Sequence, residues 1–283
     1  MSGDEEKMRE ISEINELIKT RMSKIKRKIV VLSGKGGVGK SVVTANLALA
    51  LAWHGRPNLI GVLDADITGP SIPKILNARK QFLSVGPPGI FPAIGPLGIK
   101  IISMDYLLPN DETPVIWRGP MKASAIRQFL AEIVWGDLEY LLVDLPPGTG
   151  DEALTIAQSI PSINGVVIVT IPSEVSQLVV RKAVSFCRML NLPIIGIIEN
   201  MSGFICPKCG VEINILRYGG GERIAKDMSI EFLGRIPLDQ RICEASDKGV
   251  PFIVEYYETP AAKAFMSIVE KIENIFSKNQ SKP

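Results

Sequence analysis

Glycine, lysine and serine residues recur with the spacing of a phosphate-binding loop in one eight-residue stretch, Gly34-Lys35-Gly36-Gly37-Val38-Gly39-Lys40-Ser41. Glycines let backbone N–H groups turn inward around phosphate oxygens, and Lys40 is placed to reach the β- and γ-phosphates. The hydroxyl of Ser41 is a hard oxygen ligand of the kind that Mg²⁺ prefers. The stretch therefore predicts a site for a nucleoside triphosphate and its Mg²⁺ ion.

The segments on either side of this stretch support the same interpretation. Residues 28–32 form a short apolar run typical of a buried strand, and residues 41–53 favour a helix. A phosphate group binds where a strand leads through a glycine loop into a helix, because the N–H groups of the helix N-terminus face the anion. We predict that ATP binds to Gly34 to Ser41 and to the following Val42.

Carboxylates stand at the ends of two further apolar runs. Residues 59–63 lead into Asp64 and Asp66, and residues 138–143 lead into Asp144. The carboxyl ends of parallel strands meet at one edge of a sheet, so these side chains are expected near Ser41. Asp144 also precedes the glycine-containing loop 145–151, which can respond to a γ-phosphate. We predict Asp144 as a Mg²⁺ ligand.

The order of apolar runs predicts an α/β fold. Runs at 99–104, 166–171, 194–198 and 232–236 are mostly separated by helical patterns such as 123–134 and 175–190. Continuous apolar strands that alternate with helices indicate a mostly parallel central sheet flanked by helices on both faces. We predict a helical or flexible arm over residues 1–27 and a single domain over 28–283. Residues 76–97 are expected to form a surface excursion or irregular hairpin.

Composition narrows the class of partner. The 283 residues include 32 basic and 30 acidic side chains, and 46% are hydrophobic. This balance predicts neither nucleic acid nor a membrane as a partner. With no signal-peptide pattern and no long uncharged apolar run, a cytoplasmic location is expected. The one histidine, His54, lies at the end of the predicted helix 41–53, so we expect it to be structural and expect neither a histidine-based triad nor a histidine-rich metal site.

Cys206 and Cys209 form the second group of residues that could carry chemistry. A Cys-x-x-Cys turn brings two sulfurs to one side, but two thiolates are only half of a tetrahedral zinc or iron–sulfur set. A homodimer could supply the other half about its two-fold axis. A redox pair and half of a zinc site share this spacing. The remaining cysteines, Cys187 and Cys243, are expected to be buried, inert thiols.

Lys35 is a second lysine of the loop, one residue after its first glycine and five residues before Lys40. Its position resembles the deviant Walker A motif of the P-loop ATPases that include MinD, ParA, the nitrogenase iron protein and the Mrp/ApbC carriers. Six segments in family order resemble the Mrp/ApbC family in particular: Gly34 to Ser41, Asp64 to Ser71, Trp117 to Pro120, Val143 to Asp151, Asn200 to Cys209 and Ile236 to Asp239.

The resemblance implies an ATP-hydrolysing homodimer that holds a labile 4Fe–4S cluster between Cys206 and Cys209 of both chains and hands it to apo iron–sulfur proteins. It implies that Lys35 reaches the partner's phosphates, Asp66 positions the attacking water and Asp64 supports the metal shell. Asn200 would then lie near adenine, with Pro237 as a further nucleotide contact.

Two alternatives remain open at this point. One is a MinD- or ParA-like positioning switch controlled by ATP-driven dimerisation. The other is an ATPase whose cysteine pair is a structural zinc clasp. The Cys-x-x-Cys turn favours the carrier over the switch, while the clasp would differ from the carrier in the metal that is bound.

Overall fold

The computed structural model describes residues 3–67, 69–79, 81, 83–107, 119–206, 208–215 and 217–280. Trp117 and Arg118, which belong to one of the six segments, lie outside these ranges, as do Thr68 and Pro207.

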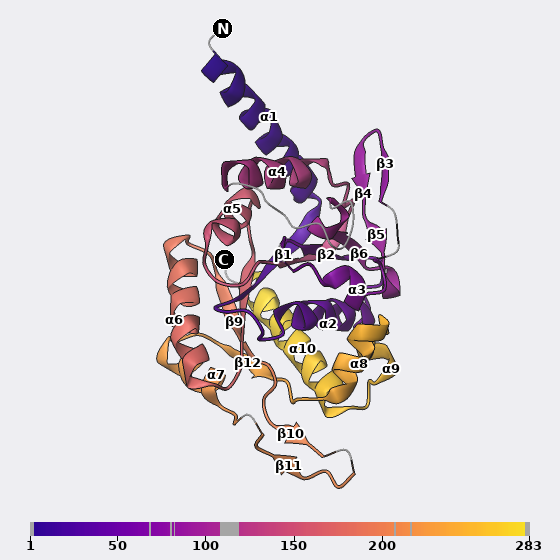
Figure 1. Ribbon diagram of the computed structural model, residues 1–283, viewed down its shortest axis with the longest axis vertical. Helices are drawn as coiled ribbons and strands as arrows, with labels where there is room; N and C mark the ends of the chain where they lie inside the picture. Colours follow the sequence, from indigo (N-terminus) through magenta and orange to yellow (C-terminus); the bar gives the residue numbers. More distant parts are fainter. Residues whose placement is uncertain are drawn as a thin grey trace.

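A parallel sheet forms the centre of the molecule (Figure 1). Among the described residues it has eight strands in the order β12-β9-β8-β1-β7-β2-β6-β5, and β5 alone pairs antiparallel to its neighbour. This confirms the predicted mostly parallel sheet. The strands are β1 (Ile25–Ser33), β2 (Ile60–Asp64), β5 (Ala93–Ile94), β6 (Lys100–Ser103), β7 (Leu138–Asp144), β8 (Gly165–Thr170), β9 (Ile194–Glu199) and β12 (Phe232–Arg235).

Helices cover both faces of the sheet and create two apolar cores. One core lies under α2 (Lys40–Trp53), α3 (Ile72–Ile75), α8 (Gln240–Lys248), α9 (Phe252–Glu255) and α10 (Pro260–Gln280). The other lies under α1 (Gly3–Ser23), α4 (Gly119–Glu132), α5 (Asp151–Ser159), α6 (Glu174–Met189) and α7 (Gly220–Asp227). Ile29 and Val31 of β1 face the first core, while Val30 and Leu32 face the second. Period-two alternation along the apolar segment from Ile29 to Leu32 thus contributes side chains to both cores.

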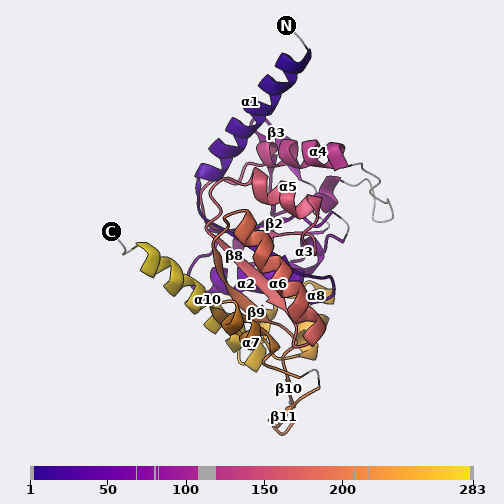
Figure 2. The same ribbon diagram turned by 90° about the vertical axis from the view of Figure 1, so that its left-hand side faces the viewer.

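The N-terminal segment is a helix that leaves the body. Ile18 and Met22, near the C-terminal end of α1, are buried in the second core, whereas Met8 and Ile11 are exposed. The N-terminal half of α1 therefore projects from the body (Figures 1 and 2). The strand that follows begins at Ile25, three residues before the boundary predicted at residue 28.

The predicted excursion at residues 76–97 contains a short antiparallel hairpin, β3 (Ser84–Gly86) with β4 (Gly89–Phe91). Short 3₁₀ turns follow at η1 (Pro96–Gly98) and η2 (Met104–Leu107). None of the described helices is both long enough and apolar enough to cross a membrane.

A second hairpin projects from the opposite end of the molecule to α1 (Figure 2). It pairs β10 (Phe204–Ile205) with β11 (Glu212–Ile213) and carries Cys206 and Cys209 in its turn. We call residues 203–218 the cysteine arm. The arm leaves the body of the molecule just after β9 and rejoins it just before α7.

Candidate functional site

The predicted phosphate loop joins β1 to α2. Gly37 and Gly39 have positive φ angles of 77° and 78°, a region that favours glycine. A Cβ atom at Gly34 would lie 2.6 Å from the carbonyl oxygen of Val179 in α6, so the loop can approach this helix only with glycine at position 34. The glycines thus shape the loop as well as free its N–H groups.

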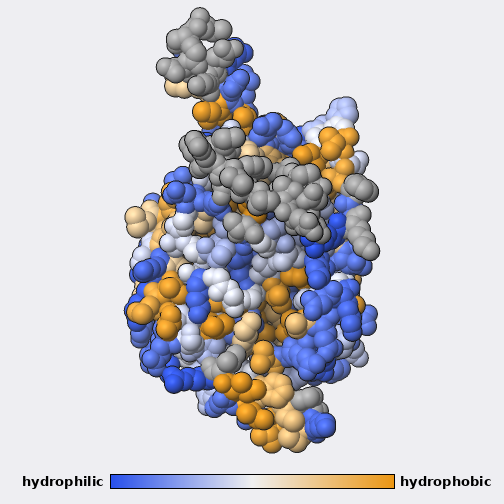
Figure 3. All heavy atoms as spheres, viewed as in Figure 1, coloured by the Kyte–Doolittle hydropathy of each residue, from blue (hydrophilic) through white to orange (hydrophobic). Residues whose placement is uncertain are grey.

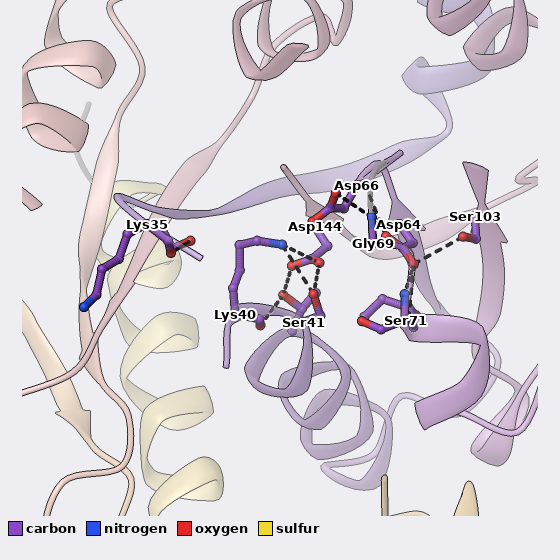
Figure 4. A network of polar contacts seen from close by, with 12 residues as sticks. Lys35, Lys40, Ser41, Asp64, Asp66, Gly69, Ser71, Ser103 and Asp144 are labelled. Atoms are coloured by element: carbon purple, nitrogen blue, oxygen red, sulfur yellow. Dashed lines mark hydrogen bonds and ion pairs between the residues drawn. The ribbon is translucent and has the colours of Figure 1, made fainter. Parts of the chain in front are cut away.

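Asp144 stands at the centre of a buried polar cluster at the start of α2 (Figure 4). Its Oδ2 lies 2.6 Å from Nζ of Lys40 and accepts a 2.5 Å hydrogen bond from the hydroxyl of Ser41. Its Oδ1 accepts a 2.6 Å hydrogen bond from the hydroxyl of Thr44. The structure therefore brings together three residues that the sequence predicted, Lys40, Ser41 and Asp144.

Thr44 was missed by the sequence analysis, although a signal exists. It follows Lys40 by four residues, so both side chains lie on one face of α2. The Thr44 hydroxyl oxygen also lies 3.0 Å from the carbonyl oxygen of Lys40. The same hydroxyl fixes the orientation of the Asp144 carboxylate from the side opposite Ser41.

Asp64 holds a loop in place. Its Oδ2 accepts hydrogen bonds from the backbone N–H groups of Ser71 (3.0 Å) and Ile72 (3.1 Å) and from the hydroxyl of Ser103 (3.2 Å). Complete burial, followed by the neighbouring charge of Asp144, raises the pKa of Asp64 to about 8. In this structure Asp64 organises the segment that contains Asp66. Ser103 is a further partner that sequence reasoning did not identify.

Asp66 faces the phosphate loop. Its Oδ1 accepts a hydrogen bond from the N–H of Gly69 at 3.2 Å. Asp66, Lys40 and Ser41 line one cavity of about 230 Å³, which the phosphate-loop glycines and Pro147 also line. An aspartate predicted to position water thus lies beside the residues predicted to bind phosphates.

Lys35 differs from Lys40 in direction. Figure 4 shows the Lys35 side chain extending away from the cluster of Lys40, Ser41 and Asp144. The lysine lines the same cavity and is partly exposed. Its own carbonyl oxygen accepts a 3.0 Å hydrogen bond from the hydroxyl of Ser33, which fixes the local backbone.

A larger cavity of about 400 Å³ adjoins the phosphate loop. Asn200 is part of its wall and donates from Nδ2 to the carbonyl oxygen of Val38 at 2.9 Å. A Cβ atom at Gly39 would lie only 2.4 Å from this amide nitrogen. Asn200, predicted near adenine, and Pro237, predicted as a further nucleotide contact, line the same cavity, whose lining also includes Val42, Met201, Ile242 and Cys243.

Cys206 and Cys209 are accessible on the cysteine arm. Cys206 is half-buried and Cys209 is exposed. Hydrogen bonds from the backbone N–H groups of Cys209 and Lys208, together with the Cys209 side chain, lower the pKa of the Cys206 thiol. Within the described ranges, no group of three or more His, Cys, Asp or Glu side chains converges as metal ligands. The described part of one chain therefore offers a pair of thiols on the arm.

The other two cysteines are separated from the arm. Cys187 is buried in α6, and burial raises its pKa to about 12. Cys243 is exposed, so the prediction that it is buried was wrong. Helix α8 is short and amphipathic; it buries Ala245, and Cys243 faces the 400 Å³ cavity instead.

Glu199 is a buried acid that the sequence analysis did not select. It is the last residue of β9 and accepts hydrogen bonds from the hydroxyl of Ser202 at 2.5 Å and from the N–H groups of Gly219 (2.8 Å) and Gly221. A carboxylate at the end of an apolar strand was the available signal, as it was for Asp64 and Asp144.

The fold and the phosphate-loop cluster define a P-loop NTPase. Residues 24–273 match the family ParA, described as NUBPL iron-transfer P-loop NTPase. This match spans most of the chain, and the chain belongs to this family.

Similar proteins agree with the assignment. The chain is 58% identical over 255 residues to the iron–sulfur cluster carrier protein of Methanocaldococcus jannaschii, covering 90% of this chain and 87% of the relative. It is 51% identical to the protein of the same name from Saccharolobus solfataricus over 263 residues, covering 93% and 88% of the two chains.

Solved structures show the same architecture. A nucleotide-binding protein of Archaeoglobus fulgidus in complex with ADP is 40% identical, with a TM-score of 0.76 and coverage of 89% of this chain and 96% of that one. MinD of Pyrococcus horikoshii in complex with Mg-ADP has a TM-score of 0.65 at 22% identity, covering 88% and 96%. The second likeness is one of fold alone.

Proposed function

We propose that this protein is an ATP-hydrolysing carrier that binds a 4Fe–4S cluster as cargo across a homodimer and delivers it to apo iron–sulfur proteins. The observation that carries the proposal is the presence, in one chain, of the Lys40–Ser41–Asp144 cluster at the phosphate loop and an accessible thiol pair on a projecting arm. The naming of relatives as iron–sulfur cluster carriers supports it.

The oxygen atoms at the phosphate loop suit Mg²⁺. The hydroxyl of Ser41 and the carboxylate of Asp144 are hard ligands that already lie 2.5 Å apart. These residues would hold the ion, directly or through water, and the ion would neutralise charge on the phosphates. Asp64 would support this shell indirectly, because its contacts fix the loop that carries Asp66.

Hydrolysis would rest on positioning and electrostatics. Asp66 lines the phosphate cavity and is placed to orient an attacking water. Lys40 would move its charge from Asp144 to the β- and γ-phosphates, and Lys35 would extend to the phosphates of a second copy. A cation supplied from a partner stabilises the charge of a phosphoryl-transfer transition state.

A second copy of the chain would complete the cluster site. Two thiolates per chain leave two of four positions to be filled, and a two-fold axis supplies an identical pair. Exposed apolar side chains support contact at this end of the molecule. They include Val211, Ile213, Ile215 and Tyr218 on the cysteine arm, where Figure 3 shows an apolar patch, and Val175 and Leu178 on α6.

Anaerobic purification followed by measurement of iron, acid-labile sulfide and zinc tests the proposal. We expect four iron and four sulfide per dimer, as the geometry of a 4Fe–4S cluster requires. Cys206→Ala and Cys209→Ala should each abolish stable cluster binding and leave ATP affinity unchanged. Cys187→Ala should retain the cluster. Zinc without sulfide in the unmodified protein would establish a structural clasp, and a full cluster in the Cys206→Ala/Cys209→Ala double variant would refute the interfacial site.

A further inference from the structure

One buried carboxylate joins the two ends of the cysteine arm. Glu199 accepts hydrogen bonds from the hydroxyl of Ser202, just before the arm, and from the N–H groups of Gly219 and Gly221, just after it. Its side chain is completely buried. Hydrogen bonds to an ionised acceptor are stronger than neutral ones, and their loss in a buried site leaves donors unsatisfied. The direction in which the arm leaves the body thus depends on Glu199.

The backbone after the arm is built to approach this carboxylate. Gly219 has a φ angle of 80° and precedes the first turn of α7. A Cβ atom at Gly221 would lie 3.0 Å from Cβ of Glu199 and 3.1 Å from its Oε2. The carboxylate also lies at the N-terminus of α7, where unpaired N–H groups and the helix dipole favour a negative charge.

The next residue in the chain bonds the phosphate loop. Asn200 donates from its side chain to the carbonyl oxygen of Val38, and its N–H donates to the carbonyl oxygen of Thr170 at 2.8 Å. Two successive side chains at the end of β9 therefore bond two different parts of the molecule. Glu199 holds the cysteine arm, and Asn200 holds the loop that is expected to bind ATP.

A second connection runs beside the first. The N–H of Ser202 donates to the carbonyl oxygen of Ile236 at 2.9 Å, and the N–H of Leu238 donates to the carbonyl oxygen of Gly203 at 2.8 Å. Pro237 and Leu238 line the 400 Å³ cavity beside the phosphate loop, and they also line a cavity of about 320 Å³ that Cys206 lines. The base of the arm and the expected nucleotide cavity therefore share a wall.

We propose that Glu199 is a positioning residue that transmits the nucleotide state of the phosphate loop to the Cys206 and Cys209 thiols. A displacement of Val38 or Pro237 on nucleotide binding would move Asn200 and the base of the arm, and Glu199 makes the arm follow as one body. The inference rests on the proposed function, because cluster delivery is what would give this coupling a use. Its physical content is a coupling between two parts of this chain.

Thiol alkylation in cluster-free protein measures this coupling. The full chain is treated with iodoacetamide with and without a non-hydrolysable ATP analogue and Mg²⁺, and the modification of Cys206 is followed by mass spectrometry of the arm peptide. Coupling free energies between sites correspond to changes of about fivefold or more, so we expect the nucleotide to change the Cys206 rate by about that factor. In Glu199→Gln the ratio of the two rates should approach one, while the protein still binds the analogue.

Matched variants separate coupling from a general loss of structure. Glu212→Gln removes the same charge from an exposed position on the arm, where Glu212 pairs with Arg235 at 3.2 Å, and should preserve the nucleotide effect. Ser202→Ala removes one of the Glu199 contacts and should reduce the effect partly, which keeps the test usable if Glu199→Gln does not fold. A purely structural role would alter the rate without nucleotide but preserve the ratio.

Two results would overturn the coupling: a Cys206 rate in the unmodified protein that does not respond to nucleotide, or a Glu199→Gln protein that binds the analogue and keeps the full ratio. Because the measurement uses neither iron nor sulfide, it is independent of cargo identity. Zinc in place of the cluster would refute the proposed function and leave this result unaffected.

Discussion

The Nζ of Lys40 lies 2.6 Å from Oδ2 of Asp144, and both side chains are almost completely buried. Removing one partner of such a pair leaves an uncompensated buried charge and typically costs about 3–5 kcal/mol. The carboxylate therefore fixes the lysine at the base of the phosphate loop. Lys35, from the same loop, extends away from this pair (Figure 4).

The different positions of the two lysines predict different defects. Lys40→Ala should weaken ATP binding by about tenfold to a hundredfold, because a charge-assisted hydrogen bond contributes about 1.5–3 kcal/mol. Lys35→Ala should bind ATP normally and lose turnover by about 100-fold or more, since a cation supplied in trans is worth at least that much in related chemistry. Titration calorimetry and phosphate release measure the two quantities, and undiminished turnover in Lys35→Ala would eliminate the trans role.

Substitutions of Asp66 and Asp144, the two carboxylates beside the phosphate loop, should also cause different defects. Asp66→Ala is expected to retain Mg·ATP and lose most turnover, because water positioning matters more to the transition state than to ground-state binding. Asp144→Asn should weaken Mg²⁺-dependent ATP binding, since Asp144 contacts both Lys40 and Ser41. Comparison of ATP affinity at several Mg²⁺ concentrations with the turnover rate tests this division. Equal losses of binding in both variants would contradict it.

Local patterns predicted the parts of the site that are contiguous in sequence. The phosphate loop and the aspartates at strand ends are each encoded by a few neighbouring residues, and the parallel sheet brings their edges together. Thr44 and Glu199 carried local signals, but neither those signals nor the residue type of Ser103 predicted which distant residues each would contact. Ser103, for example, reaches Asp64 only because β6 pairs beside β2.

Exposure was harder to predict for short amphipathic helices. Nine residues of α8 leave few turns from which to determine a buried face. Cys243 is two positions before the buried Ala245, which places it on the other side of the helix. Thiol chemistry alone suggested burial there, and the packing of α8 decided otherwise.

Two glycines of the phosphate loop provide a matched test of its packing. Gly34→Ala would place Cβ 2.6 Å from a backbone oxygen of Val179, a contact that no side-chain rotation relieves. At Gly36 an added Cβ would meet only Pro147, at 4.0 Å. We expect Gly34→Ala to lower unfolding free energy by about 1–3 kcal/mol, the usual cost of overpacking, and Gly36→Ala to change it by less than about 1 kcal/mol. Chemical denaturation measures both free energies. Equal stability of the two variants would show that the loop can shift away from α6 to make room for the added Cβ atom.

Cys206 should react as a thiolate at lower pH in the folded protein than in the unfolded chain. Hydrogen bonds from the N–H groups of Cys209 and Lys208 favour its charged form and lower the thiol pKa. Since the thiolate is the nucleophile, the pH at which the alkylation rate reaches half its maximum should shift downward in the folded state. Cys187, whose pKa is raised to about 12 by burial, should remain unmodified until the protein unfolds. Iodoacetamide rates for each cysteine, measured by mass spectrometry across a pH series in native and urea-unfolded protein, test both statements. The same midpoint for Cys206 in the two states would show that the turn does not stabilise the thiolate, and rapid native labelling of Cys187 would show that the core under α6 opens.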